Sequence, residues 1–244
     1  MALRNIMIKK KHNKIINVPY IDQTKDWPTG CESVSAVMLL QYLGVDISVG
    51  RFVEQYLEKE PLFERDGKLY GPDPWKVFAG DPADEKSMGC YAPVIKKALE
   101  KVLQENIGTA AGRRAAGWGD GSPEALEKGR WQWKKDPAAF PKTVDLTGVS
   151  METLLRDYID CDIPVIFWAS IDLKETYAGP EWILTDSGET FLWRSNEHCM
   201  LLVGYDEENY YFNDPWHDHG TIGYERKLVE KRHEEQYGMA VAII

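Results

Sequence analysis

The sequence has few cysteines, and none of them forms a paired motif. The four cysteines, Cys31, Cys90, Cys161 and Cys199, lie too far apart in the chain for any CxxC pair. A zinc ribbon or a dithiol of the thioredoxin type is therefore not indicated. A chain of 244 residues can bury a full core without a disulfide framework. We expect at least three of the thiols to be free.

Long apolar segments and an excess of positive charge are also missing. No apolar run approaches the roughly 18 residues of a membrane span, and the longest, HCMLLVGY, has the length of a strand. The net charge of −10 makes nucleic acid an unsuitable partner, because binding to it relies on clustered Lys and Arg. The sequence gives no indication of the oligomeric state.

The one basic segment, MALRNIMIKKKHNK at the N-terminus, is expected to be a solvated tail rather than a binding patch. No apolar segment follows it, so no signal peptide is visible in this chain. A cytoplasmic protein and an extracytoplasmic protein whose leader has been removed both fit this pattern, and the compartment stays open.

The pattern of apolar residues predicts helices early in the chain and strands late in it. Helices are expected over 31–43, 48–58, 92–105, 149–161 and 226–237. Strands are expected over 14–21, 163–170, 181–185, 198–205, 210–215, 221–225 and 239–244. The stretch 70–93 is rich in Gly and Pro and is expected to be an ordered loop. This order of elements predicts an α+β fold.

Residues 106–145 lose the periodicity of the surrounding chain. The segment contains Trp118, Trp131 and Trp133 together with several glycines and prolines. We interpret it as an insertion, partly helical around 123–135, within a single domain that spans residues 1–244. It could roof a substrate cleft, or its tryptophans could pack a small local core, and the sequence leaves both interpretations open.

Cys31 stands where a helix is about to begin, in the stretch PTGCESVSAVMLLQYLG. The unpaired N–H groups and the dipole of a helix N-terminus favour an anion, and a thiol in this position is expected to have a lowered pKa. The neighbouring charge of Glu32 acts in the opposite direction. A nucleophilic thiolate therefore needs a second group, which is normally a histidine.

His198 is the candidate partner among the five histidines, because it opens a buried strand. His12 lies in the basic tail, and His233 lies in a charged helix, where solvation is expected. His217 and His219 belong to the turn WHDHG. With nearby Asp214 they also form a pattern of metal ligands, which is kept as an alternative.

Asp214 is the candidate that orients His198, because it lies at the end of the strand that returns from the His198 strand. A two-residue loop at 207–208 would place Asp214 opposite Leu201, on the wrong face. A shift of one residue would place it opposite Met200, on the face of His198. A catalytic pair therefore requires a bulge or an odd loop in this hairpin.

Acyl transfer also needs donors for an oxyanion. The backbone N–H of Cys31 is one candidate, and the side-chain amide of Gln23 in the preceding loop is a second.

The order of sequence blocks resembles the bacteriocin-processing-peptidase-like cysteine peptidases, which belong to the wider papain-like group. The blocks are VPYIDQ, PTGCESVSAVMLLQYLG, GPDPWKVFAGDP, SMGCYAP, DIPVIFW, HCMLLVGYD and NDPW. The resemblance covers residues 17–104 and 149–244. It implies a papain-like fold, in which an N-terminal helical part with the nucleophile helix packs on a C-terminal antiparallel sheet.

Carried over by position, the resemblance makes Cys31 the nucleophile, His198 the general base, Asp214 the orienting acid and Gln23 the oxyanion donor. It implies a thiol protease or related amide hydrolase that acts on a peptide or protein, with no cofactor. The same residues could transfer the acyl group to an amine instead of water. The alternative from a different class is a non-catalytic peptide-binding module on the same scaffold.

Overall fold

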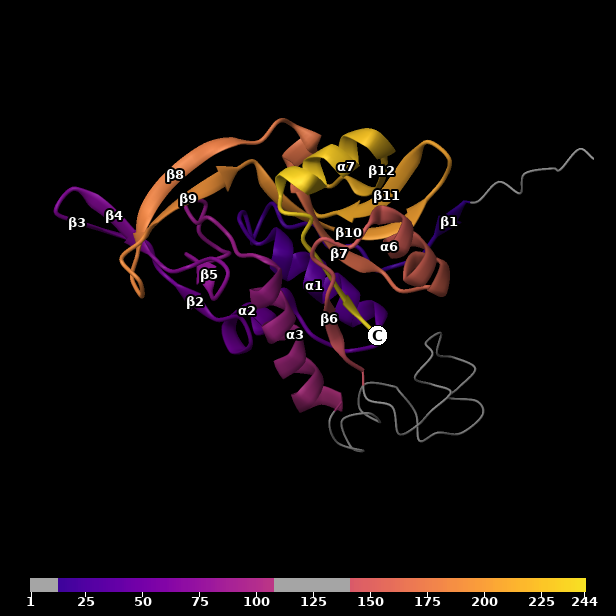
Figure 1. Cartoon of the computed structure of the whole chain (residues 1–244). Helices are drawn as coiled ribbons and strands as arrows, with labels where there is room; N and C mark the ends of the chain where they lie inside the picture. The colour runs from indigo at the N-terminus through magenta and orange to yellow at the C-terminus, as the bar shows by residue number, and fades with distance from the viewer. Residues whose placement is uncertain (1–12, 108–140) are drawn as a thin grey trace, which may run out of the picture.

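The computed structural model describes residues 13–107 and 141–244 of the chain (Figure 1). The greater part of the predicted insertion at 106–145 lies outside these residues. The expected helix around 123–135 and the tryptophans Trp118, Trp131 and Trp133 belong to that part. The described ends of the insertion close a helix at Ile107 and form a short strand over Thr143–Asp145.

The fold is α+β, as predicted, with a large antiparallel sheet and five α-helices in the described residues. The helices are α1 (Cys31–Tyr42), α2 (Val49–Gln55), α3 (Ala92–Ile107), α6 (Met151–Asp157) and α7 (Arg226–Glu235). The main sheet follows the order β12 (Gly220–Glu225), β11 (Asn209–Asp214), β10 (Glu197–Tyr205), β7 (Val165–Ser170), β13 (Ala240–Ile243) and β6 (Thr143–Asp145), and β1 (Lys14–Ile15) pairs with β10.

A second sheet extends away from the main one, at the left of Figure 1. Its strands are β3 (Phe63–Arg65), β4 (Lys68–Gly71), β8 (Tyr177–Leu184) and β9 (Thr190–Ser195), and β2 (Lys59–Glu60) pairs with β5 (Phe78–Ala79) nearby. The sequence predicted only residues 181–185 of this sheet. All three residues of β3 are exposed, so this strand has no apolar alternation by which it could be recognised.

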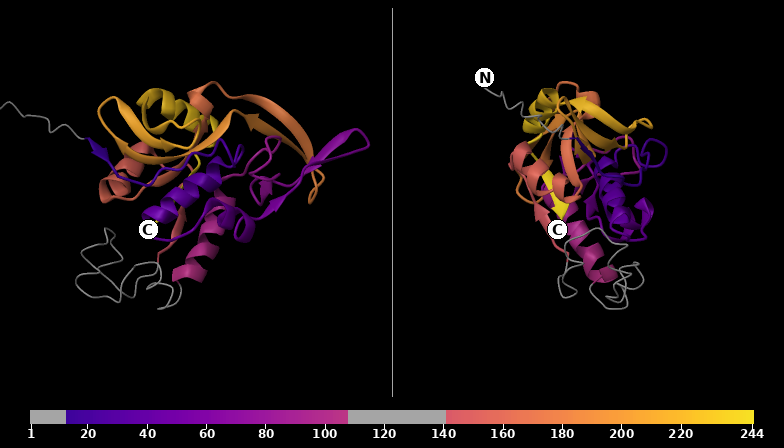
Figure 2. Two further views of the ribbon diagram at one scale, coloured as in Figure 1. Left: turned by 180° about the vertical axis from the view of Figure 1, so that it is seen from behind. Right: turned by 90° about the vertical axis from the view of Figure 1, so that its right-hand side faces the viewer.

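Helix α1 is buried almost all round, because its first ten residues, Cys31–Leu40, are all buried. It contacts β7 and β10 of the main sheet as well as α2 and α3, and Figure 2 shows it near the centre of the molecule. Ser35 Oγ donates a hydrogen bond of 3.2 Å to the carbonyl oxygen of Cys199 in β10. Helix α7 covers the other face of the main sheet (Figure 1).

The predicted ends of three helices are confirmed. Helix α1 ends with Gly44 at a φ of +83°, and Val45 N donates to Leu40 O at 3.0 Å, which is the pattern of a Schellman motif. Ser48 Oγ caps α2, and Ser150 Oγ caps α6, each by accepting a backbone N–H. The strand expected over 14–21 is shorter and comprises Lys14–Ile15 alone.

The hairpin of β10 and β11 contains the kind of irregularity that a pairing of His198 with Asp214 required. Leu201 pairs with Asn213 and Leu202 with Phe212, but the next pair is Gly204 with Tyr211. Val203 is therefore the extra residue of a bulge. Continued by one residue, this register places Asp214 opposite Met200, on the face of His198.

No helix in the described parts of the chain combines the length and the apolar character that are needed to cross a bilayer.

Candidate active site

The start of α1 and the start of β10 meet in the interior of the molecule. Cys31 is the first residue of α1 and is 6% exposed. Its sulfur lies close to the backbone of Cys199, the residue that follows His198 in β10. The thiol also lies 3.4 Å from Glu32 Oε2. All four cysteines are free, as predicted.

The environment of Cys31 raises the pKa of its thiol, which corrects the expectation of a lowered value. Burial is the largest cause, followed by the charges of Glu32 and Glu197. Both effects disfavour the thiolate and so favour the neutral thiol in the free protein.

His198 and Asp214 form a buried hydrogen-bonded pair. His198 Nε2 lies 2.7 Å from Asp214 Oδ1, and each side chain is 1% exposed. The bond to Nε2 leaves Nδ1 as the nitrogen available to another group. No hydrogen bond joins the Cys31 sulfur to the His198 ring in the described residues, although the charge of His198 acts on neighbouring Glu32.

Asp214 accepts hydrogen bonds from three further groups. Trp216 N donates to Oδ1 at 3.0 Å, and Tyr224 Oη donates to Oδ2 at 2.7 Å. His219 Nδ1 lies 3.1 Å from Oδ2. Burial acts to raise the pKa of Asp214, but His198 and these donors hold it well below its usual value. Asp214 is therefore an ionised carboxylate inside the protein.

Tyr224 and His219 were not identified from the sequence as partners of Asp214. Tyr224 lies in β12, which pairs with β11. Its side chain could be assigned to the carboxylate only once the order and register of the strands were known.

Gln23 is buried in the loop before α1 and is 1% exposed. Its backbone N–H donates to the carbonyl of Pro215 at 2.9 Å, which ties this loop to the residue after Asp214. Its side-chain Nε2 donates to the carbonyl of Pro28 at 3.2 Å. The bond to Pro28 fixes the amide and uses one of its two hydrogens, so the second remains available.

A pair of buried carboxyl groups lies beside Cys31 and was not predicted. Glu32 is fully buried and Glu197 is 9% exposed. Glu32 Oε1 accepts the backbone N–H of Cys90 at 2.6 Å. Burial raises the pKa of Glu32 to about 7, and burial together with the charge of Glu32 raises that of Glu197 well above its usual value.

Gly89 makes room for this pair of carboxyl groups. A Cβ at this position would lie 2.7 Å from Glu32 Oε1 and 3.3 Å from Glu197 Oε2. The residue also has a φ of +133°, a conformation that side chains other than glycine rarely adopt. A side chain at position 89 would therefore displace the carboxyl groups and strain the backbone.

Two other predictions for histidines are not supported. His233 is 6% exposed rather than solvated, because its ring stacks on Phe167 at 3.9 Å and its Nδ1 bonds to Trp168 O at 2.8 Å. Among the described residues, the metal-ligand pattern of Asp214, His217 and His219 does not gather into one cluster. His217 is exposed and lies against the ring of Trp216.

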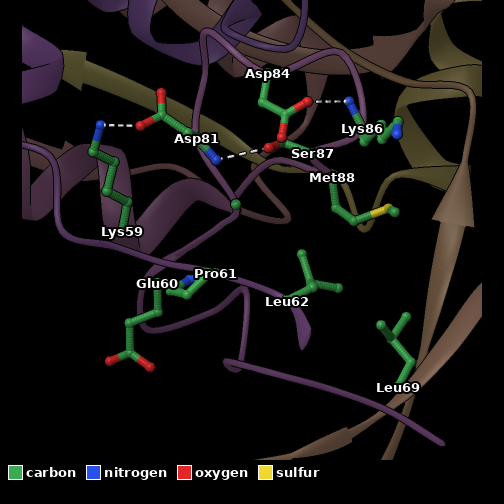
Figure 3. A pocket seen from close by; sticks show the side chains of 11 residues that line it. Lys59, Glu60, Pro61, Leu62, Leu69, Asp81, Asp84, Lys86, Ser87 and Met88 are labelled. Carbon is green, nitrogen blue, oxygen red and sulfur yellow. Dashed lines mark hydrogen bonds and ion pairs between the residues drawn. The ribbon is translucent and has the colours of Figure 1, made fainter. Parts of the chain in front are cut away.

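A pocket of about 510 Å³ is lined by residues of the segments 59–62 and 80–88 together with Leu69 (Figure 3). Leu62, Leu69 and Met88 give it an apolar part, and the ion pair of Lys59 with Asp81 lies at its edge. The Thr29 hydroxyl lies within 3.4 Å of the carbonyl oxygens of Asp81, Pro82 and Asp84, and the nearest acceptor is that of Asp84 at 3.0 Å. None of the four predicted site residues lines this pocket.

The comparisons identify the chain as a member of a family of papain-like cysteine peptidases. The profile of the Peptidase_C39 like family matches residues 15–111 and 100–241, and the chain belongs to this family. It is 23% identical over 214 residues to the uncharacterized protein YvpB of Bacillus subtilis (strain 168), a match that covers 88% of this chain and 68% of YvpB.

A solved structure has the same fold. It is the crystal structure of a protein from Bacillus anthracis that is described as a "putative C39-like peptidase". The two structures superpose with a TM-score of 0.71 at 23% identity, over 96% of this chain and 98% of the other.

Proposed function

We propose that the protein is a cysteine peptidase or related amide hydrolase, with Cys31 as nucleophile, His198 as general base and Asp214 as orienting acid. The observation that carries the proposal is the buried bond of 2.7 Å between His198 Nε2 and Asp214 Oδ1. An ionised carboxylate on Nε2 fixes the ring and its tautomer, so that Nδ1 is the nitrogen that can accept a proton. The Cys31 sulfur lies close to the backbone of Cys199, the residue after His198 in β10, and this position supports the role of Cys31 as nucleophile.

The reaction starts from the neutral thiol. Cys31 Sγ attacks the carbonyl carbon of the substrate while the thiol proton passes to His198 Nδ1, and the carbonyl oxygen becomes an oxyanion. The C–N bond then breaks, and the leaving amine takes the proton from His198. Water attacks the thioester with His198 again accepting a proton, and the products are a carboxylic acid and the free thiol.

Gln23 and the backbone of Cys31 are proposed to hold the oxyanion. The free hydrogen of Gln23 Nε2 and the unpaired N–H of the first helical residue are two donors of the kind that this step requires. The bond from Gln23 to Pro28 supports the role, because a donor held in place before the reaction needs no reorganisation during it.

The substrate is proposed to be a peptide or protein. A polypeptide that passes Cys31 could place a side chain in the pocket beside Met88, because the loop that lines this pocket bonds directly to Thr29. The two overlapping profile matches support a single domain, so we propose that one domain carries both pocket and nucleophile.

The test is the hydrolysis of a mixture of unrelated peptides, with the products identified by mass spectrometry. The wild-type protein is expected to release new termini, and Cys31→Ala is expected to release none. Cys161→Ala is the matched control, because this cysteine is partly exposed and lies outside the site; it should cleave like the wild type. Cleavage that survives in Cys31→Ala would contradict the proposal.

A non-catalytic peptide-binding module is the second candidate, and the neutral, buried thiol of Cys31 is the observation that favours it. This candidate predicts that the wild type retains peptides from the same mixture without cleaving them. It also predicts that Cys31→Ala retains the same peptides.

A further inference from the structure

Three side chains beside the proposed nucleophile could hold a metal ion. One ligand atom from each of Cys31, Glu32 and Glu197 lies within 4.8 Å of the other two. All three residues are buried. Two of them are adjacent at the start of α1 and the third begins β10, so two separate elements of the fold bring the cluster together.

The spacing of two of the ligand atoms fits a tetrahedral ion. Cys31 Sγ and Glu32 Oε2 are 3.4 Å apart. With a Zn–S distance of about 2.3 Å and a Zn–O distance of about 2.0 Å, this separation corresponds to an angle of about 104° at the metal. Tetrahedral coordination is the geometry that zinc prefers in proteins. These two ligands therefore need no rearrangement to bind the ion.

An unpartnered atom of Glu197 points to a ligand independently of the spacing. Glu197 Oε1 is buried and has no hydrogen-bond partner among the described residues. Buried polar atoms in proteins are nearly always paired, so each exception calls for an explanation. Glu197 also lies beside a second buried carboxyl group, and a cation between the two would compensate both charges.

The donor set selects zinc over the common hard cations. Mg²⁺ and Ca²⁺ are bound by oxygen ligands, whereas a thiolate with two carboxylates suits a borderline-soft ion such as Zn²⁺. Three protein ligands leave a fourth position for water, and Gly89 keeps the space between the two carboxyl groups free of a side chain.

We propose that Cys31, Glu32 and Glu197 form a Zn²⁺ site, and that zinc inhibits the enzyme by occupying the sulfur of the nucleophile. The binding part of this inference stands on the cluster alone, whereas the inhibition rests on the proposed function. Coordination displaces the thiol proton and uses the sulfur lone pair that would attack a substrate.

The test measures the rate at which iodoacetamide alkylates Cys31 in the full chain, with and without ZnCl₂, by mass spectrometry of the peptides. Zinc is expected to slow alkylation of Cys31 by at least about tenfold, and a chelator should restore the rate. Cys161 is the internal reference, and MgCl₂ is the control ion. An unchanged rate for Cys31 at saturating zinc would overturn the proposal.

Two conservative variants assign the ligands. In Glu197→Gln and Glu32→Gln, the zinc concentration that gives half protection should rise at least about tenfold, with each variant compared with its own zinc-free rate. His217→Ala removes an exposed histidine outside the cluster and should match the wild type. Equal half-protecting concentrations in the wild type and both glutamine variants would exclude the two carboxyl groups as ligands.

Calorimetric titration with ZnCl₂ separates this proposal from the proposed function. One zinc ion per chain should bind to the wild type and none to Cys31→Ala. If Cys31 is not alkylated even without zinc, the nucleophile assignment fails while the calorimetric stoichiometry still decides the metal site. If Cys31 is alkylated and no zinc binds, the metal site fails and the nucleophile assignment stands.

Discussion

Asp214 and Glu197 are both buried carboxyl groups in the main sheet, but their surroundings differ. Asp214 accepts hydrogen bonds from His198, Tyr224, Trp216 and His219. Glu197 has an oxygen with no hydrogen-bond partner among the described residues. The pKa of Asp214 is held well below its usual value, whereas burial raises the pKa of Glu197 well above it.

The comparison shows that the neighbouring charge and hydrogen-bond donors, rather than burial, decide which of these carboxyl groups is charged. Burial disfavours the ionised form of both groups, and only around Asp214 do the charge of His198 and the donors reverse that effect. The His198–Asp214 pair can therefore stabilise an imidazolium during a reaction. Glu32 accepts the backbone N–H of Cys90, but Glu197 Oε1 has no partner among the described residues, and a bound cation would supply what is missing there.

The largest expected effect comes from removal of the imidazole of His198, which bonds to Asp214. His198→Ala should lower the rate of peptide hydrolysis by about 10³-fold or more, because it removes the group that is proposed to take the proton of Cys31 and pass it to the leaving amine. The measurement is kcat/KM on a peptide that the wild type cleaves. His217→Ala is the matched control and should retain the wild-type rate; an active His198→Ala would show that the pair is structural.

A smaller loss is expected when Asp214 loses its charge and keeps its shape. Asp214→Asn should lower kcat by about 10²- to 10⁴-fold, because the amide no longer fixes the tautomer of His198 or stabilises its charge. It should also lower the free energy of unfolding by about 1–3 kcal/mol, because Tyr224 and His219 lose an ionised acceptor. Urea denaturation measures the second effect, and an unchanged midpoint would contradict it.

Replacement of the carboxyl group by an amide should have the opposite effect on the free energy of unfolding at Glu197. Glu197→Gln is expected to raise the free energy of unfolding at neutral pH by about 1 kcal/mol, because it removes a buried ionisable group that lacks a full set of partners. Urea denaturation in the presence of a chelator measures this effect without bound metal. Glu207→Gln, on the exposed hairpin loop, is the control and should change stability by less than about 0.5 kcal/mol.

A third buried group, His233, should make the free energy of unfolding depend on pH in the acid range. Burial lowers its pKa to about 4, from an ordinary value of 6.5. Between these values the unfolded chain binds a proton that the folded protein does not. Stability is therefore complete above pH 6.5 and falls as the pH decreases toward 4, by up to about 3 kcal/mol.

The variant His233→Asn tests whether His233 causes this loss of stability at acid pH. The Asn amide can still donate to the carbonyl of Trp168 but does not titrate. Urea denaturation at several pH values should show a flatter dependence in this window than in the wild type, whatever the absolute stability of the variant. The same slope in both proteins would mean that another group causes it.

Local patterns in the sequence were sufficient to predict the elements that frame the site. The apolar positions and Gly44 identified α1, and the hypothesis of a His198–Asp214 pair required a bulge or an odd loop in the hairpin, which contains a bulge. These features depend on residues that are near one another in the chain. Sequence reasoning is reliable for such features.

The features that were missed depend on contacts between distant parts of the chain. Glu32 and Glu197 meet only because α1 packs on β10, and no local pattern marks Glu197. His233 lies in a charged helix, yet the stacking of its ring on Phe167 buries it. The raised pKa of Cys31 likewise follows from burial and from a carboxyl group contributed by another element.

The central claim is that the His198–Asp214 pair activates Cys31, and the most direct test is the rate of Cys31 alkylation at neutral pH in metal-free protein. Wild type, His198→Ala and Asp214→Asn are compared by mass spectrometry, with Cys161 as the reference thiol in each sample. The account predicts that Cys31, normalised to Cys161 in the same sample, is alkylated faster in the wild type than in either variant. A Cys31 rate that is the same in all three proteins would contradict it.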